Sequence, residues 1–327
     1  MDQKKTAQIL IELPTWLGDS VMASAAIENI VDYYGAIEIT IIGSFSSIET
    51  LKHHPKIVKS IIFESKYKSL YKNYSQLGGF DDYFTFRSSF RATLLKLLVR
   101  SKNKYQFKKK NSTKNTHQVK QYVEFVNKSL NIDFPAGNLV VNNVQCRTLN
   151  STKIIGINPG GTYGSAKRWY PDEFAKIATE LSDRFDIVIF GGENERIFAE
   201  EIEKKLIQKK ITNYRNLAGK TSISELINEI GNLDLFITGD SGPMHIAASL
   251  KIPTISIFGP TNDHETSQWN NSNSLVIKKR LDCQPCMKKI CPLKHHNCMK
   301  LIKAEDVISA IPSIYIDFKV INKSMMI

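Results

Sequence analysis

The first residue that could do chemistry is an acid placed shortly after the first apolar segment. That segment, 8–13, ends at Pro14, and Asp19 stands just before 21–34, whose apolar residues recur at helical spacing. A carboxylate at a helix start caps free backbone N–H groups or serves as a general base, and the residues alone leave both interpretations open. The turn lacks the G-x-G-x-x-G pattern, which argues against a dinucleotide-dependent oxidoreductase.

A glycine-rich loop with hydroxyls and a lysine follows a strand-like segment in the second half. It runs from 158 to 169 and contains Thr162, Ser165 and Lys167. Glycines let backbone N–H groups approach a phosphate closely, and the two hydroxyls add donors. Lys167 would offset the charge of a leaving diphosphate. We therefore expect an anion-binding loop here, with a flexible surface loop as the alternative.

A third candidate is the sequence Gly-Asp-Ser-Gly-Pro-Met-His at 239–245. Gly242 keeps side chains out of the way and the proline suits a first helical turn, so the run predicts a helix N-terminus able to bind an anion. Asp240 would cap this helix or bind a sugar hydroxyl, and Ser241 lies beside it. Taken alone, His245 favours a core position over a ligand contact. The turn at 258–261 is a further candidate for a phosphate or base contact.

Short apolar segments alternate with helical ones, which predicts crossover units and parallel sheets. The strand-like segments are 8–13, 37–42, 58–63, 83–86, 153–157, 186–190, 233–238 and 254–258. Helices are expected at 171–184, which begins with proline and acids, and at 222–230, which begins with a capping box. Residues 132–152 have the composition of a linker.

We therefore predict an α/β protein with two Rossmann-like domains, 1–150 and 151–327, whose parallel sheets face a central cleft. The last helix is a candidate to pack back on the first domain. Ligands of such sheets bind outside the carboxyl ends of the strands, and the candidate residues all follow strand-like segments.

The net charge of +12 is concentrated in the first half. Residues 1–150 hold 21 Lys and Arg against 12 Asp and Glu, and 151–327 hold 23 against 20. Within 83–123 there are 11 basic residues and no acidic one. This excess predicts an anionic partner such as nucleic acid, a membrane face or a phosphorylated substrate, although a solvated lysine-rich surface has the same composition. The polar stretch 100–116 is expected to be a mobile surface segment.

Four of the five cysteines are crowded near the C-terminus. Cys283, Cys286, Cys291 and Cys298 stand close to two histidines, and Cys146 lies far away. The spacing differs from a pair of C-x2-C hooks, so bound zinc and reduced structural thiols both remain open. This usage predicts a reducing, cytoplasmic setting, and no apolar run is long enough for a transmembrane helix or a secretory signal.

In three passages the sequence resembles the ADP-heptose:lipopolysaccharide heptosyltransferases of glycosyltransferase family 9, the type II enzymes above all. Residues 11–22 are similar to the family's strand, W-x-G-D and helix opening, and 158–169 to its loop ending in A-K-R-W. The run from 217 through 239–245 to 258–261 is similar to its C-terminal half. The segment with Cys-Pro-Leu-Lys-His-His also resembles the type II enzymes. The likeness spans most of 8–310 and implies a GT-B fold.

The resemblance implies inverting transfer of L-glycero-D-manno-heptose from ADP-heptose to the inner-core heptose of lipopolysaccharide or lipooligosaccharide. Asp19 is similar to the family's general base and Lys167 to the lysine that stabilises the diphosphate. The donor-binding residues implied by the resemblance are Thr162, Ser165, Glu195, Asp240, Ser241, Gly242 and His245. Arg87 and Arg91, chosen for their charge, are expected to bind the acceptor.

We expect no metal or other cofactor, because the sequence has no D-x-D and Lys167 with helix-end amides would neutralise the diphosphate. The expected partners are ADP-heptose, a lipid A–inner core acceptor and, by peripheral contact, the cytoplasmic face of the inner membrane. The alternatives are a type I or III heptosyltransferase or another nucleotide-sugar transferase. A basic nucleic-acid-binding protein is disfavoured, because residues 100–120 contain only Tyr105 and Phe107 as stacking platforms.

Overall fold

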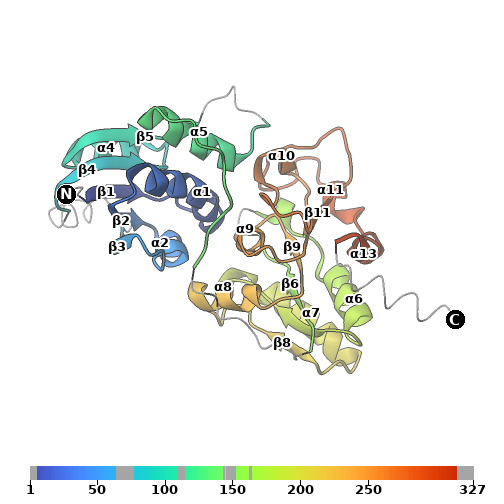
Figure 1. The fold of residues 1–327 in the computed structure, drawn as a ribbon. Helices are drawn as coiled ribbons and strands as arrows, with labels where there is room; N and C mark the ends of the chain where they lie inside the picture. The colour runs from blue at the N-terminus through green and yellow to red at the C-terminus, as the bar shows by residue number, and fades with distance from the viewer. Residues whose placement is uncertain are drawn as a thin grey trace. The chain divides into compact units, whose positions relative to one another are not determined.

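The structure is a computed structural model that describes residues 6–63, 77–109, 115–142, 144, 152–161 and 164–314. The chain forms two compact units, unit 1 (Met1–Asn143) and unit 2 (Val144–Ile327). Each unit is built on a parallel sheet with helices connecting its strands (Figure 1). Within the described ranges, every helix is too short or too polar to span a bilayer.

Unit 1 carries a five-stranded parallel sheet in the order β3-β2-β1-β4-β5. Its strands are β1 (Ala7–Glu12), β2 (Ile37–Gly43), β3 (Ile57–Ile62), β4 (Phe80–Thr85) and β5 (Ser101–Gln106). Its helices are α1 (Leu17–Tyr34), α2 (Phe45–Leu51), α4 (Phe90–Leu98) and α5 (Gln118–Leu130). β1 is central, and Ile9, Leu10 and Ile11 are fully buried, because helices cover both faces of a parallel sheet.

Local sequence explains where the helices of unit 1 begin and end. Ser89 caps α4 by accepting the Ala92 N–H, and α5 ends at Asn131, whose left-handed backbone (φ 54°) suits a helix C-terminus. α1 packs against α2 and α5, and its small residues Ala23 and Ala26 are fully buried. The turn that follows β1 is therefore held at the carboxyl edge of the sheet.

Part of the basic stretch is a strand, which corrects one expectation. Residues 101–106 form β5 at the sheet edge, paired with β4, so the prediction of a mobile segment over 100–116 is wrong there. An edge strand pairs on one flank only, and exposed lysines such as Lys102 are the residues that edge strands favour. Residues 110–114 lie outside the described part of the chain.

Unit 2 carries a six-stranded parallel sheet in the order β11-β10-β9-β6-β7-β8. Its strands are β6 (Ile154–Asn158), β7 (Asp186–Ile189), β8 (Tyr214–Asn216), β9 (Leu235–Gly239), β10 (Thr254–Ile257) and β11 (Ser274–Ile277). Its helices are α6 (Pro171–Leu181), α7 (Arg196–Gln208), α8 (Ile223–Gly231), α9 (Gly242–Ser249), α10 (Asp263–Thr266), α11 (Asn297–Lys300), α12 (Ala304–Ile308) and α13 (Ile311–Ile314). Two short 3₁₀ turns cover Ser165–Lys167 and Glu193–Glu195.

Helix starts in unit 2 follow the predicted signals. α6 begins at Pro171, and α8 has the expected capping box, in which Ser222 and Glu225 exchange side-chain to backbone hydrogen bonds. The buried Glu173 of α6 accepts the Ala304 N–H at 2.9 Å and so ties α6 to α12. α12 and α13 contribute Val307, Ile311 and Ile314 to the core of unit 2.

A glycine in the central strand β6 permits close packing of the core. A Cβ on Gly156 would lie 2.5 to 2.9 Å from the side chains of Leu233, Phe236 and Phe190, well inside van der Waals contact. The aromatic rings therefore approach the strand backbone directly, as is typical of glycine inside a strand. This packing fixes β6, which carries the glycine-rich loop at its carboxyl end.

Candidate active site

Four candidate loops lie next to one another at the carboxyl edge of the sheet in unit 2. They follow β10, β9, β6 and β7, which are neighbours in that order in the sheet. Segments about 100 residues apart in the sequence are thereby brought to one edge, where open parallel sheets bind ligands. The predictions that placed candidate residues after strands 153–157, 186–190, 233–238 and 254–258 are confirmed as to position.

Lys167 and Asp240 form a largely buried ion pair at this edge. The Lys167 Nζ lies 2.6 Å from Asp240 Oδ2, and their side chains are 15% and 7% exposed. The Thr261 hydroxyl, from the loop after β10, donates to the same carboxylate oxygen at 2.7 Å. Three loops thus meet at one carboxylate. The arrangement holds the ammonium group in place, and an incoming anion would find it already oriented.

A second set of contacts joins the loops after β6 and β9. The buried Asn158 amide donates to Thr238 Oγ1 at 2.9 Å and to Ser241 Oγ at 3.0 Å. Ser241 is the residue that precedes α9, and its hydroxyl makes no capping bond to that helix. Asp240 does not cap α9 either, so the interpretation of Asp240 as a helix cap is wrong: its carboxylate is used by Lys167 and Thr261. Gly242 is the first residue of α9.

Glu195 is a buried carboxylate with an unused oxygen. Its Oε2 accepts the Gly192 N–H at 2.8 Å, whereas Oε1 is inaccessible to solvent and has no hydrogen-bond partner among the described residues. An unsatisfied buried oxygen is costly, and a hydroxyl donor of a ligand would relieve it. A Cβ on Gly160 would lie 2.9 Å from the Glu195 Cγ, so this glycine leaves room for the carboxylate.

The remaining donor candidates are placed less directly. Ser165 begins the 3₁₀ turn that ends with Lys167, and Thr162 lies outside the described residues. His245 is 4% exposed in the first turn of α9, a buried position as the residue taken alone favoured.

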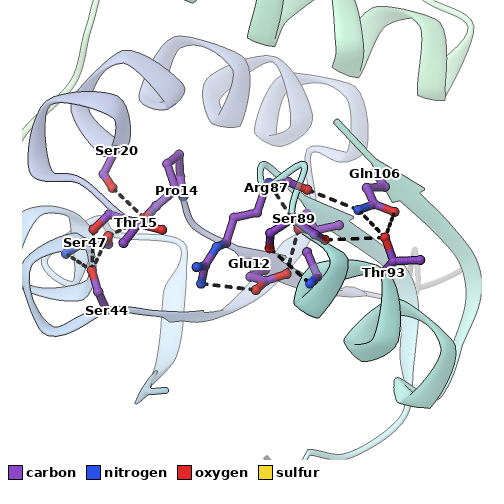
Figure 2. A network of polar contacts seen from close by, with 12 residues as sticks. Glu12, Pro14, Thr15, Ser20, Ser44, Ser47, Arg87, Ser89, Thr93 and Gln106 are labelled. Carbon is purple, nitrogen blue, oxygen red and sulfur yellow. Dashed lines mark hydrogen bonds and ion pairs between the residues drawn. The ribbon is translucent and has the colours of Figure 1, made fainter. Parts of the chain in front are cut away.

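In unit 1, Asp19 is the third residue of α1 and is half-buried. Its turn is held by α2: the Ser44 hydroxyl donates to the Thr15 carbonyl at 2.7 Å, and the Ser47 hydroxyl donates to the Pro14 carbonyl (Figure 2). Burial and, second, the Asp19 charge raise the pKa of Tyr122 on α5 well above its usual value. Asp19 is therefore a carboxyl group on a fixed turn, as a general base requires.

Sequence reasoning missed Glu12, the last residue of β1. Glu12 is 3% exposed and accepts hydrogen bonds from the Tyr83 hydroxyl at 2.8 Å and the Thr85 hydroxyl at 2.7 Å. The Arg87 guanidinium lies 3.6 Å from its other oxygen (Figure 2). The Gln106 amide also donates to the Arg87 carbonyl at 3.3 Å. A charged residue at the end of an otherwise apolar strand is the signal by which the sequence could have indicated Glu12.

The two arginines expected to bind an acceptor thus differ. Arg87 is positioned by Glu12 and is 17% exposed, so part of its guanidinium reaches the surface. Arg91 lies in the first turn of α4 and is half-buried. Both follow β4, at the same sheet edge as the turn of Asp19.

The four cysteines of 283–298 gather next to the loops after β6 and β10. All four line one cavity of about 20 Å³, together with Ala166 and Pro260 of the loops after β6 and β10. Burial, and then the neighbouring thiols, raise the pKa of Cys298 to about 11, so it is protonated at neutral pH. In the part of the chain that the structure describes, no three His, Cys, Asp or Glu side chains are arranged to hold a metal ion. Cys146 lies outside that part.

This segment also contacts the glycine-rich loop through main-chain groups. The His296 ring nitrogen Nε2 pairs with the Ala166 carbonyl at 2.9 Å, and its Nδ1 pairs with the Tyr170 hydroxyl at 3.0 Å. The Ala166 N–H donates to the Lys289 carbonyl at 3.0 Å. A Cβ on Gly164 would lie only 2.4 Å from that carbonyl oxygen, so only glycine permits this approach. The cysteine segment thus supports the loop that carries Lys167.

The chain is similar to known proteins over most of its length. The chain matches the profile of glycosyltransferase family 9 (heptosyltransferase) over residues 93–297. It is 42% identical over 312 residues to lipooligosaccharide heptosyltransferase 2 of Campylobacter jejuni, which covers 92% of this chain and 96% of that protein. The chain belongs to glycosyltransferase family 9. Lipopolysaccharide heptosyltransferase 2 of Escherichia coli K12 is 34% identical over 124 residues, 38% of this chain and 36% of that protein.

Solved structures share the fold of this glycosyltransferase. E. coli ADP-heptose lipopolysaccharide heptosyltransferase II has a TM-score of 0.78 at 21% identity, over 95% of this chain and 99% of that one. E. coli heptosyltransferase WaaC with ADP has a TM-score of 0.74 at 15% identity, over 94% and 99%. The prediction of a GT-B fold with two Rossmann-like parallel α/β units is confirmed.

Proposed function

We propose that this chain transfers L-glycero-D-manno-heptose from ADP-heptose to the inner-core heptose of lipopolysaccharide or lipooligosaccharide. One observation carries the proposal: the 42% identity, over nearly the full length of both chains, to a lipooligosaccharide heptosyltransferase 2. The geometry supports it, since unit 2 offers a lysine and a buried carboxylate with one unsatisfied oxygen at one sheet edge, and unit 1 offers an acid on a rigid turn.

Unit 2 takes the donor in this proposal. Lys167 moves partly away from Asp240 and neutralises the diphosphate. Ser241 and Gly242, at the start of α9, donate backbone N–H groups to the same diphosphate. Asp240 then binds hydroxyls of the transferred sugar, with His245 near it on α9. Glu195 Oε1 accepts a hydroxyl of the nucleoside, and Ser165 binds the phosphates, as the sequence also predicts for Thr162.

Unit 1 takes the acceptor. Asp19 removes the proton of the acceptor hydroxyl while that oxygen bonds to the anomeric carbon and the bond from that carbon to the diphosphate breaks. ADP leaves with its charge balanced by Lys167, and one displacement inverts the configuration. Arg87, held by Glu12, and Arg91 bind anionic groups of the acceptor.

Transfer on this account needs no metal cofactor, because Lys167 and the amides of α9 carry the neutralisation that a cation supplies elsewhere. Turnover should therefore persist after exhaustive dialysis against a chelator. We place the enzyme in the cytoplasm, in peripheral contact with the inner membrane. The excess of positive charge in residues 1–150 supports an acceptor and a surface that are anionic.

Mass spectrometry of the core oligosaccharide from a gene-deletion strain tests the function. We expect a core truncated after its first heptose, restored by the wild-type gene. A core that lacks all heptose, or one that lacks only a later heptose, would assign the chain to the type I or type III reaction instead. An unchanged core would overturn the proposal.

A further inference from the structure

Helix α4 of unit 1 has apolar side chains on both its buried side and its exposed side. Ala92 and Leu95 face the core, whereas Phe90 is 73%, Leu97 71% and Leu98 48% exposed. A helix that is apolar on the side away from its core marks an interaction surface, since such side chains gain by leaving water. We call Phe90, Leu97 and Leu98 the apolar patch of α4.

Beside this patch lies a cavity lined by lysines. It has a volume of about 430 Å³, and Lys96, Lys104, Lys108 and Lys128 line it. The carboxylate in its lining, Glu124, is paired with Lys128, so the other lysines give the cavity a net positive charge. The chain has no acidic residue at all from 83 to 123, which includes the whole of α4 and β5.

The patch and the cavity are joined by a direct contact. Lys104 of β5 donates to the main-chain carbonyl of Leu97 at 3.2 Å, and Lys96 stands next to Leu97 on α4. The ammonium group of Lys104 and the backbone of Leu97 thus meet, so the helix that carries the apolar patch also borders the cavity. Such a combination fits an anionic bilayer, in which leucine and phenylalanine enter the interface and lysines meet headgroup phosphates.

Nucleic acid fits the same surface less well. Base stacking along a strand needs several free aromatic faces, and Phe90 offers one, but Tyr105 already stacks on Phe84, with ring centroids 4.9 Å apart. Phe107 is 7% exposed and packs edge-on against Tyr122 and Phe125. Exposed leucines contribute nothing to a phosphate backbone. The observations therefore favour lipid over RNA.

We infer that the apolar patch of α4 and the adjoining lysine-lined cavity dock this enzyme on a bilayer of anionic phospholipid. The inference deepens the proposed function, on which it rests, by assigning the membrane contact to one surface. Phe90 and Leu97 insert among the headgroups, and Lys96 and Lys108 bind phosphates. An enzyme docked in this way meets a lipid-borne acceptor by diffusion in two dimensions.

Vesicle flotation tests the surface with the full-length protein. Wild type should float with vesicles of equal parts phosphatidylglycerol and phosphatidylcholine and not with phosphatidylcholine alone. The double variant Phe90→Ser, Leu97→Ser should bind roughly tenfold or more weakly. Lys96→Gln and Lys108→Gln should each weaken binding about fivefold, with reduced sensitivity to salt.

Matched controls use equally exposed side chains of unit 2. Ile197 and Ile207 on α7 are 60% and 59% exposed, so Ile197→Ser, Ile207→Ser should leave flotation unchanged, as should Lys204→Gln. Thermal unfolding of every variant should match wild type, because none of these side chains is buried in the core. If the α4 double variant floats as wild type does, or if phosphatidylcholine alone suffices, the inference is wrong.

Two further readouts separate this inference from its rivals. The inference is overturned if the wild type binds polyuridylate and not anionic vesicles, and if the lysine variants bind polyuridylate more weakly. The surface would then be a nucleic-acid site. With a water-soluble, delipidated acceptor, the α4 variants should turn over at the wild-type rate, and with a vesicle-borne acceptor they should be slow. Specific vesicle binding without transfer to any acceptor would refute the proposed function and leave the surface standing.

Discussion

The carboxyl edges of the two sheets differ in how their polar groups are satisfied. In unit 2, polar side chains from the loops after β6, β9 and β10 bind one another within about 3 Å, as Lys167, Asp240 and Thr261 do. In unit 1, Asp19 is half-buried, and the Arg87 guanidinium lies 3.6 Å from the buried Glu12, a longer contact than those of unit 2. The first pattern suits one rigid, small ligand, and the second suits a large anionic partner with many surface contacts. The charge follows the same division, with a net +9 in residues 1–150 and +3 in 151–327.

The largest effect should come from the acid of unit 1. Asp19→Asn removes the general base and should lower turnover by roughly a thousandfold, while ADP affinity stays within twofold of wild type. Single-turnover kinetics and calorimetric ADP titration measure the two quantities. Asp32→Asn, on the exposed side of the same helix, is the control. Turnover near the wild-type rate in Asp19→Asn would remove Asp19 from the chemistry.

A variant of unit 2 should lose less turnover but should also lose ADP affinity. Lys167→Ala removes the diphosphate's counter-charge and leaves Asp240 buried without its cation, so turnover should fall about a hundredfold and ADP affinity about tenfold. Lys176→Ala on α6 should change neither. We therefore predict that Lys167→Ala lowers both turnover and ADP affinity, whereas Asp19→Asn lowers turnover alone. An unchanged ADP affinity in Lys167→Ala would contradict the assignment of donor binding to unit 2.

A variant of Glu12 tests whether acceptor binding needs Arg87 to be held in place by this carboxylate or needs only its charge. Glu12→Gln keeps most hydrogen-bonding atoms but frees Arg87, so the KM for the acceptor should rise about tenfold with ADP affinity unchanged. The free energy of unfolding should fall by about 1–3 kcal/mol, measured by urea denaturation. Glu49→Gln, whose carboxylate has a local partner in Lys52, is the control. A loss of stability with an unchanged acceptor KM would make the Glu12–Arg87 contact purely structural.

The thiols of unit 2 should affect stability rather than catalysis. The pKa of Cys298 is raised from about 9 to about 11, first by burial and then by the thiols of Cys286, Cys291 and Cys283. Between these values the unfolded chain loses a proton that the folded chain keeps, so the free energy of unfolding should fall by about 1–3 kcal/mol as pH rises from 9 to 11. Cys298→Ala should remove that slope without changing transfer at neutral pH. An equal slope in both proteins would exclude Cys298 as its source.

Much of the fold could be predicted because buried parallel strands are apolar runs with polar turns after them. β1, β6, β9 and β10 have this character, and the start of α8 carried its capping box in the sequence. β5 was missed because an edge strand, Ser-Lys-Asn-Lys-Tyr-Gln, owes its structure to pairing with β4 and not to its own composition.

The candidate site divides in the same way. Lys167 and Asp240 could be predicted as candidate site residues because each lies in a local motif whose glycines and hydroxyls indicate a ligand-binding loop. Their ion pair could not be found, since it joins residues 73 positions apart. Glu12 was missed for a similar reason: its partners Tyr83 and Thr85 are 71 and 73 residues away. Sequence shows which groups are present, and the sheet order decides which of them meet.

The central claim is that this chain adds a heptose to an inner-core heptose, and one measurement tests it directly. Purified protein is incubated with ADP-heptose and with core acceptors that end before the first heptose, at the first heptose, or at the second. The masses of the products are then measured by mass spectrometry. The account predicts one added heptose, only on the acceptor that ends at the first heptose, with inverted configuration at the new linkage. Transfer to another acceptor alone, or to none, would contradict it.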